Sequence, residues 1–391
     1  MKFSKQSCGV ALVMVLAAVA VLTILVTDFM RITQIHTLGS INVRNDVKAE
    51  YMARSSVNLS RLLLAVQGVI SREMRNFHMR PPPLWQFADY FIMSFNDPTA
   101  LQMVGSVIGA PIEEAKGFGN LDGEIQVAIV DEESKINLNM ASMGPVWQQI
   151  LSRELLALFS PPVYDPIFEK KDSNGERMTR EKMVAAIIDY VDSDEVVFGS
   201  EGYPEASAYE ISEDIPPLKN APFDDIEELR NVKGVTDDFW VAFVEPEPDH
   251  PEARTLTVWG SGLININTAD PLVLYAVLCA FSANPATACS PENADKVFSL
   301  VQYMMDVRSL LSVPFANTGR FVQNVGQGVE GIPGIPLNNN DVSNYLTVDS
   351  SVFSIYATGK IGNSVRRIWT VVDTRGVNSM TGGNVLYWKI Y

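Results

Sequence analysis

An uncharged apolar run near the N-terminus constrains this chain more than any other feature. Residues 10–26 are 17 consecutive positions without a charge, and Lys2 and Lys5 precede them. As a helix the run would reach about 26 Å at 1.5 Å per residue, roughly the hydrocarbon core of a bilayer. Residues 27–31 offer no small-residue cleavage site, so we expect a retained anchor. The lysines precede the run, so the positive-inside rule places the short end in the cytoplasm and the body outside.

The anchor is predicted to continue as one long helix. Residues 28–77 contain no proline, and their apolar positions recur mostly at helical spacings with charges between them. Three prolines at 81–83 prevent further continuation. We therefore assign residues 10–27 to the membrane and residues 28–78 to an amphipathic extension outside it.

The remaining pattern predicts a sheet that is split in the sequence. Residues 124–130 alternate like a half-buried strand, and a turn at 131–134 followed by 135–139 suggests a hairpin. Further strands are predicted at 351–360, 365–373 and 385–390, and helices at 143–158, 177–191, 223–231, 270–281 and 293–311. The fold class is α+β: the long helix leads into an antiparallel α/β domain, 79–140 and 345–391, which a mainly helical domain, 141–344, interrupts.

A short motif also occurs twice, once where the predicted insertion begins and once within it. The sequence Ile-Asn-Leu-Asn-Met-Ala at 136–141 returns as Ile-Asn-Ile-Asn-Thr-Ala at 264–269, and each copy leads into a helical pattern. Both copies are interpreted as a buried strand end in which the final Asn or Thr caps the following helix.

Charge and motif content argue against nucleic-acid binding and catalysis. The net charge is −16, and residues 189–228 hold 13 acidic residues against one basic residue. Such a field repels polyanions, so nucleic acid is not an expected partner. The three histidines are scattered, and no nucleophile elbow, phosphate-binding glycine loop or His-Glu-x-x-His motif occurs. We expect no enzymatic activity.

The acidic stretch is nevertheless a candidate cation site. Asp189, Asp192 and Asp194, followed by Glu201 and Glu205, place several carboxylates on a helix end and its loop. Carboxylate oxygens are the ligands that calcium prefers, although the spacing is not that of an EF-hand. The alternative is a solvated acidic face.

The cysteines suggest one disulfide. Cys279 and Cys289 are ten residues apart, a loop that a disulfide can close, and an exported body would favour oxidation. The alternative is a pair of buried free thiols, because spacing alone does not fix Cα geometry.

The N-terminal junction resembles the type III leader of pilins and pseudopilins. Ser7, Cys8 and Gly9 precede a run that begins Val10-Ala11-Leu12-Val13-Met14. The resemblance implies that residues 1–9 are a leader, that prepilin peptidase cuts after Gly9 and that Val10 becomes the N-methylated N-terminus. Met14 stands at mature position five, where most such subunits carry Glu.

The order of the later motifs extends this resemblance. Residues 131–139, the acidic 189–194, the segment 222–234 and the motif at 264–269 follow one another as in K-type minor pseudopilins, the general secretion pathway protein K family. The resemblance implies a pilin-like sheet with an inserted helical domain, in a single-pass inner-membrane protein whose body lies in the periplasm. It also implies a place at the tip of the type II secretion pseudopilus, with other minor pseudopilins and the major pseudopilin as partners.

The same resemblance implies calcium binding within the inserted domain. It carries the ligand role onto Asp192, Asp194 and Glu205, and Glu201 is the alternative to Glu205.

Three other functions remain open from the sequence. The first is a plain signal-anchor helix, and the second is a minor pilin of a type IV pilus. The third is a membrane-anchored DNA receptor, because residues 225–234 resemble half of a helix-hairpin-helix motif. That hairpin lacks its second glycine and is flanked by acids, which weakens phosphate binding.

Overall fold

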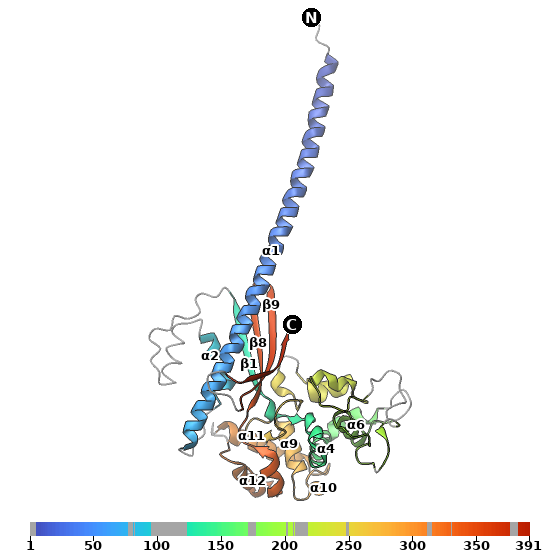
Figure 1. Cartoon of the computed structure of the whole chain (residues 1–391), viewed down its shortest axis with the longest axis vertical. Helices are drawn as coiled ribbons and strands as arrows, with labels where there is room; N and C mark the ends of the chain where they lie inside the picture. The colour runs from blue at the N-terminus through green and yellow to red at the C-terminus, as the bar shows by residue number, and fades with distance from the viewer. Residues whose placement is uncertain are drawn as a thin grey trace.

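The computed structural model describes residues 5–76, 81, 83–94, 123–170, 177–200, 202–205, 207, 218–247, 250–310, 315–329, 331–375 and 382–391. Within these ranges a long helix leaves a compact body that contains a sheet and a cluster of smaller helices (Figure 1).

Helix α1 (Lys5–Asn76) is unbroken, as the absence of proline predicts. Its apolar N-terminal part is long enough to cross a membrane and is not buried in the body. The C-terminal half packs on the sheet through small and apolar side chains, including Ala49, Ala53 and Val57. A Cβ atom at Gly359 would lie 2.1 Å from the carbonyl oxygen of Ala49, so glycine is required for this close approach.

The sheet joins segments that are far apart in the sequence. Strands β1 (Glu124–Asp131), β8 (Val352–Ile361), β9 (Ser364–Asp373) and β10 (Asn384–Ile390) lie in the order β1-β8-β9-β10, with antiparallel pairs throughout. In this register Ile129 opposes Ile355, and both side chains lie in the core that α1 covers. Trp369 and Val371 belong to the larger core shared with the inserted helices. The predicted split antiparallel sheet is therefore present.

The predicted hairpin after β1 is wrong. Residues Glu132–Ser134 form a 3-10 turn, and β2 (Ile136–Asn137) pairs in parallel with β3 (Leu256–Thr257) instead of with β1. The reason is local, because the carboxylate of Asp131 accepts the backbone N–H of Glu133 at 2.8 Å and fixes a turn that leads the chain away from the sheet.

The segment between β1 and β8 is mainly helical, as expected. Its longer helices are α4 (Pro145–Phe159), α6 (Arg180–Val191), α9 (Pro271–Ala280), α11 (Ala294–Leu310) and α12 (Thr318–Gln327). Shorter elements are η3 (Leu138–Met143), η4 (Pro162–Tyr164), α5 (Asp165–Glu169), α8 (Asp237–Phe239), η6 (Trp240–Val244), η7 (Pro251–Ala253), α10 (Pro285–Ala288) and α13 (Asn339–Tyr345), with the strand pair β5 (Gly328–Val329) and β6 (Ile332–Pro333). The predicted helix at 223–231 is a six-residue 3-10 helix, η5 (Ile226–Asn231), which the side chain of Asp225 caps. Before β1, η1 (Leu84–Phe87) and α2 (Ala88–Ser94) pack near α1.

The repeated Ile-Asn motif forms the same structure twice. The Asn139 amide accepts the N–H of Phe223 at 2.7 Å and donates to the carbonyls of Phe223 and Val258. In the second copy the amide of Asn267 makes the same three bonds, to the N–H and carbonyl of Phe315 and the carbonyl of Val348.

Each motif strand also finds an equivalent partner, because β4 (Ile264–Asn265) pairs in parallel with β7 (Leu346–Thr347) as β2 pairs with β3. The predicted helix-capping role is wrong for the final Asn of each motif, which instead fixes a distant loop to a strand end. The inserted domain is thus built from two related units, the first between residues 136 and 258 and the second between residues 264 and 348.

Three consecutive carboxylates connect the sheet to both units. Asp131 accepts hydrogen bonds from Thr268 and Ser350, and Glu132 accepts from Thr257 and from Lys135. Glu133 accepts the backbone N–H of Ser351 at 2.6 Å and the hydroxyl of Ser261 at 2.6 Å. These residues are buried, so their hydrogen bonds define how the insertion sits on the sheet.

Candidate functional site

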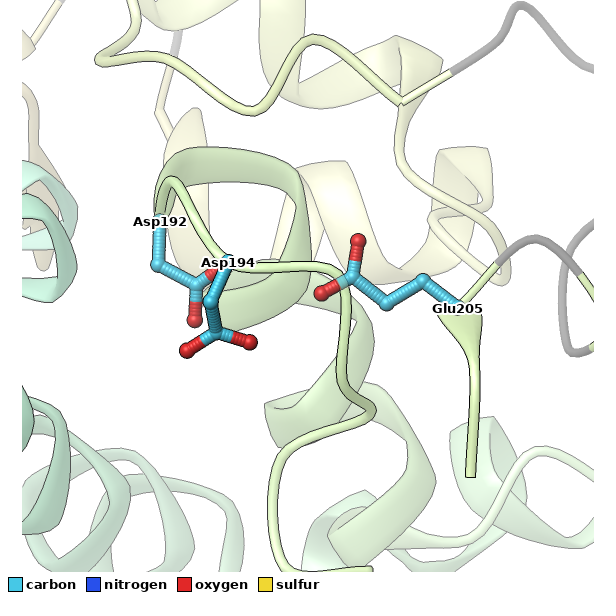
Figure 2. Close-up of side chains that lie close together, drawn as sticks. All are labelled: Asp192, Asp194 and Glu205. Atoms are coloured by element: carbon cyan, nitrogen blue, oxygen red, sulfur yellow. The ribbon is translucent and has the colours of Figure 1, made fainter. Parts of the chain in front are cut away.

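The acidic site forms where helix α6 ends. Asp192 is the residue that follows the helix, and Asp194 lies two residues further in a bend. A short return of the chain then brings Glu205 back to this point, because Val196 and Pro204 form an antiparallel bridge and the N–H of Glu205 donates to the carbonyl of Glu195 at 3.1 Å. Figure 2 shows the three carboxylate side chains converging from the helix end and from the returning segment.

The geometry of the three carboxylates suits a cation. One oxygen from each of Asp192, Asp194 and Glu205 lies within 4.8 Å of the others. Asp192 is 3% exposed and Glu205 is 2% exposed, and each keeps one buried oxygen, Oδ1 and Oε1 respectively, without a hydrogen-bond partner. A buried, unpartnered carboxylate oxygen is costly unless a proton or a cation satisfies it. The structure therefore brings together the three residues predicted as ligands, with free oxygens available.

Electrostatics at the site also favour a cation. Burial raises the pKa of Asp192 to about 7, and repulsion from Asp194 and Asp189 adds to the effect. Burial likewise raises the pKa of Glu205 to about 7, with repulsion from Asp189, Asp192 and Asp194. Because like charges destabilise the ionised state, a bound cation would remove the repulsion and restore the normal carboxylate form.

Two further residues support the carboxylates. Gln148, on helix α4, donates from Nε2 to Oδ2 of Asp192 at 3.0 Å, which holds that carboxylate and leaves Oδ1 free. Asp189, one turn earlier on α6, accepts the N–H of Phe198 at 2.8 Å and stabilises the loop. Sequence reasoning identified Asp189 as an acid of the cluster but missed Gln148, since no spacing relates α4 to the end of α6. Glu201, the predicted alternative ligand, lies outside the described residues.

The other predicted site residues lie on other elements than the acidic cluster. The predicted processing residues Gly9 and Val10 are in the first turns of the described part of α1. Cys279, at the end of α9, and Cys289, just after α10, are joined in a disulfide with a Cα–Cα distance of 5.6 Å. This bond ties the α9–α10 connection.

The segment predicted as a partial DNA-binding hairpin makes internal contacts. Asp225 accepts the hydroxyl of Tyr387 at 2.5 Å, and Glu227 pairs with Lys389 of strand β10. A Cβ atom at Gly234 would lie 2.3 Å from Met178, so its turn is packed against the body. These contacts connect the first inserted unit to the edge of the sheet.

Comparisons with known proteins concern the fold. No protein-family model and no curated protein matches the sequence. The chain is similar to a chain of the GspK-GspI-GspJ complex from the type 2 secretion system of enterotoxigenic Escherichia coli, with 17% sequence identity and a TM-score of 0.44. The match covers 69% of this chain and 80% of that chain.

Proposed function

We propose that this chain is a minor pseudopilin of a type II secretion system, a structural component at the tip of the pseudopilus rather than an enzyme. The observation that carries the proposal is the position of the inserted domain. It lies at the end of the sheet away from the apolar half of α1, while that half projects free of the body (Figure 1). A subunit of this shape has a helix available for lateral packing and a bulky end opposite its anchor.

The free half of α1 supports insertion into a membrane and into a helical bundle. Its apolar window has a mean hydropathy of 2.9 and none of it is buried in the chain itself. Such a helix needs either lipid or other helices as its surroundings. We infer an inner-membrane anchor with the body in the periplasm, and contacts with the major pseudopilin and other minor pseudopilins along α1.

Met14 supports a terminal position. In the pilins and pseudopilins that the leader resembles, the Glu at mature position five neutralises the N-terminal amine of a neighbouring subunit, because a buried unpaired charge is costly in the membrane. Met14 cannot neutralise an amine. A subunit with this residue fits the end of a filament better than its shaft.

We further propose that the acidic site binds calcium. Asp192, Asp194 and Glu205 provide hard oxygen ligands, the donor type that calcium selects. The bound ion would fix the segment around Glu205 to the end of α6. The role of the ion is therefore to stabilise the inserted domain and not to take part in a reaction.

Stoichiometry tests the tip position directly. In isolated or cross-linked pseudopili, about one copy per filament is expected, and the two minor pseudopilins of the system should cross-link to it. An abundance similar to that of the major subunit would contradict the proposal. Met14→Glu is expected to enter filament shafts or impair secretion, and Met14→Gln is the control because it adds polarity without charge.

Processing is tested by mass spectrometry of the extracted protein. We expect prepilin peptidase to release residues 1–9 and the new N-terminus at Val10 to be methylated. Gly9→Val should block this step by crowding the cleavage site. An unprocessed Met1 in cells that contain the peptidase would refute the assignment of the leader.

A further inference from the structure

Asn220 stands beside the proposed cation site with an unusual backbone. Its φ angle is +47°, and among the described residues it is the non-glycine residue with positive φ. Asparagine tolerates this left-handed conformation better than most residues, yet it remains uncommon. In this conformation the side chain lies against the acidic cluster, where its Nδ2 donates to the carbonyl of Asp194 at 3.2 Å and to Oε2 of Glu205 at 3.4 Å.

The contacts of this amide leave one atom unsatisfied. Oδ1 of Asn220 is buried without a hydrogen-bond partner, as are Oδ1 of Asp192 and Oε1 of Glu205. Three oxygens around one small site therefore lack partners, while the NH₂ group of Asn220 faces the carboxylates. This arrangement suits a site without an ion, in which the amide hydrogens partly replace a positive charge.

We propose that Asn220 is an additional, neutral ligand of the cation and that its amide turns over when the ion binds. The inference rests on the proposed cation site and extends it. A rotation of 180° about the Cβ–Cγ bond exchanges Nδ2 and Oδ1. The oxygen then lies about where Nδ2 is now, 3.2 Å from the Asp194 carbonyl oxygen and 3.4 Å from Oε2 of Glu205.

These separations match those of oxygens that share one calcium ion. With calcium–oxygen distances near 2.4 Å, neighbouring ligand oxygens lie roughly 2.8–3.4 Å apart. The carboxylates of Asp192, Asp194 and Glu205, the carbonyl of Asp194 and the amide of Asn220 supply at least five oxygens. Water completes the six to eight ligands that calcium takes, a number that suits calcium better than the smaller magnesium ion.

The added ligand connects the ion to the repeated motif. Asn220 lies three residues before Phe223, whose backbone is held by the amide of Asn139 and whose ring stacks on Tyr190 of α6 at 4.9 Å. An ion bound by Asn220 and by Asp192 would therefore hold the chain beside Phe223 and the chain beside Tyr190 at the same time. Calcium would stabilise the loop that closes the first inserted unit.

Terbium luminescence in the full chain, extracted in detergent, tests the inference. Terbium takes calcium sites, and its lifetimes in H₂O and D₂O count the water molecules bound to the ion. Asn220→Gly removes the amide and leaves the left-handed backbone without strain. We expect one more bound water than in the wild type and a calcium Kd weakened at least about tenfold, since even indirect partners of a metal contribute that much. Asn220→Asp keeps an oxygen and should preserve the water count and bind calcium at least as tightly.

A second variant separates this inference from the proposed site. Asp192→Asn removes a carboxylate ligand and should abolish terbium binding at micromolar concentrations. If it does so while Asn220→Gly keeps the wild-type water count and affinity, Asn220 is not a ligand and the cation site stands. If the wild-type chain binds neither terbium nor calcium, both the site and the role of Asn220 are rejected.

Discussion

Glu154 provides a quantitative test of the packing in the inserted domain. It lies on α4, its exposed fraction is 0%, and neither carboxylate oxygen has a hydrogen-bond partner. Burial raises its pKa to about 8, and the neighbouring Arg153 opposes the shift only in part. The guanidinium of Arg153 is occupied by Asp341 and the carbonyl of Ala280. At pH 7 the folded chain therefore holds Glu154 in its protonated form.

The cost of this burial follows from the two pKa values. The ordinary value is 4.5 and the folded value is about 8, so between these pH values the folded chain retains a proton that the unfolded chain releases. One pKa unit corresponds to 1.36 kcal/mol, so the cost is about 3 kcal/mol at pH 7 and approaches about 5 kcal/mol above pH 8. It is absent below pH 4.5, where both states are protonated. Stability should thus fall as pH rises, and Glu154→Gln should remove this dependence.

Guanidinium unfolding of the full chain in detergent measures the effect, followed by the summed fluorescence of the six tryptophans, one of which, Trp147, lies on the same helix as Glu154. Guanidinium also screens the charges on the surface, so the contribution of the buried Glu154 to the pH dependence of stability is easier to measure. The stability gain of Glu154→Gln should be small near pH 4.5 and grow to about 3 kcal/mol at pH 7. Glu181→Gln, an exposed acid on α6, is the control and should show no such growth. A gain that is constant from pH 4.5 to 9 would show that Glu154 is not held protonated.

Three other changes are expected to have measurable effects. The affinity for calcium, measured by calorimetry, should fall below pH 7, because the ion must displace protons from Asp192 and Glu205. For each proton displaced, the fall should be up to about tenfold for every unit by which the pH is lowered. An affinity independent of pH would contradict this. Gly359→Ala should lower the free energy of unfolding by about 3 kcal/mol, because its Cβ would collide with α1, whereas Gly68→Ala has open space and should not. Reduction of the disulfide at Cys279 should increase hydrogen exchange in α9 and leave α6 unchanged, and equal loosening of both helices would disprove independent units.

The elements that the sequence predicts well are those with a strong local pattern. The long helix follows from an uninterrupted helical periodicity that ends before consecutive prolines, and the strands of the sheet follow from alternation between turn residues. Helices α12 and α13 were not predicted. Their sequences contain glycines and several asparagines, and only a few residues such as Phe321, Val325 and Val342 are buried. Whether such a short segment forms a helix depends more on its tertiary contacts than on its local sequence preference.

Errors in the prediction came from side chains that bond to distant backbone. The chain after β1 looks like a hairpin because strand-like residues follow a polar turn, yet Asp131 caps that turn and its other oxygen binds Thr268 and Ser350. Nothing local in the sequence shows that these partners exist. The roles of Asn139 and Asn267 were missed for the same reason.

The acidic site was predictable in composition but not in geometry. Asp192 and Asp194 are adjacent to the end of a predicted helix, whereas Glu205 reaches them only through the bridge between Val196 and Pro204. The spacing is not that of an EF-hand, so sequence alone left a solvated acidic face as an alternative. The unpartnered buried oxygens are the observation that distinguishes a candidate site from such a face.

The two units differ in what cross-links the stretch of chain between the last asparagine of the motif and the phenylalanine whose backbone it binds. Asn267 and Phe315 are 48 residues apart, and in this stretch the disulfide ties α9 to α10. Asn139 and Phe223 are 84 residues apart, and this longer stretch contains the acidic site but no disulfide within its described residues. A longer loop costs more entropy to close, so it gains more from a cross-link. A cation held by Asp192, Glu205 and Asn220 would provide one, with the difference that it depends on the ion concentration outside the membrane.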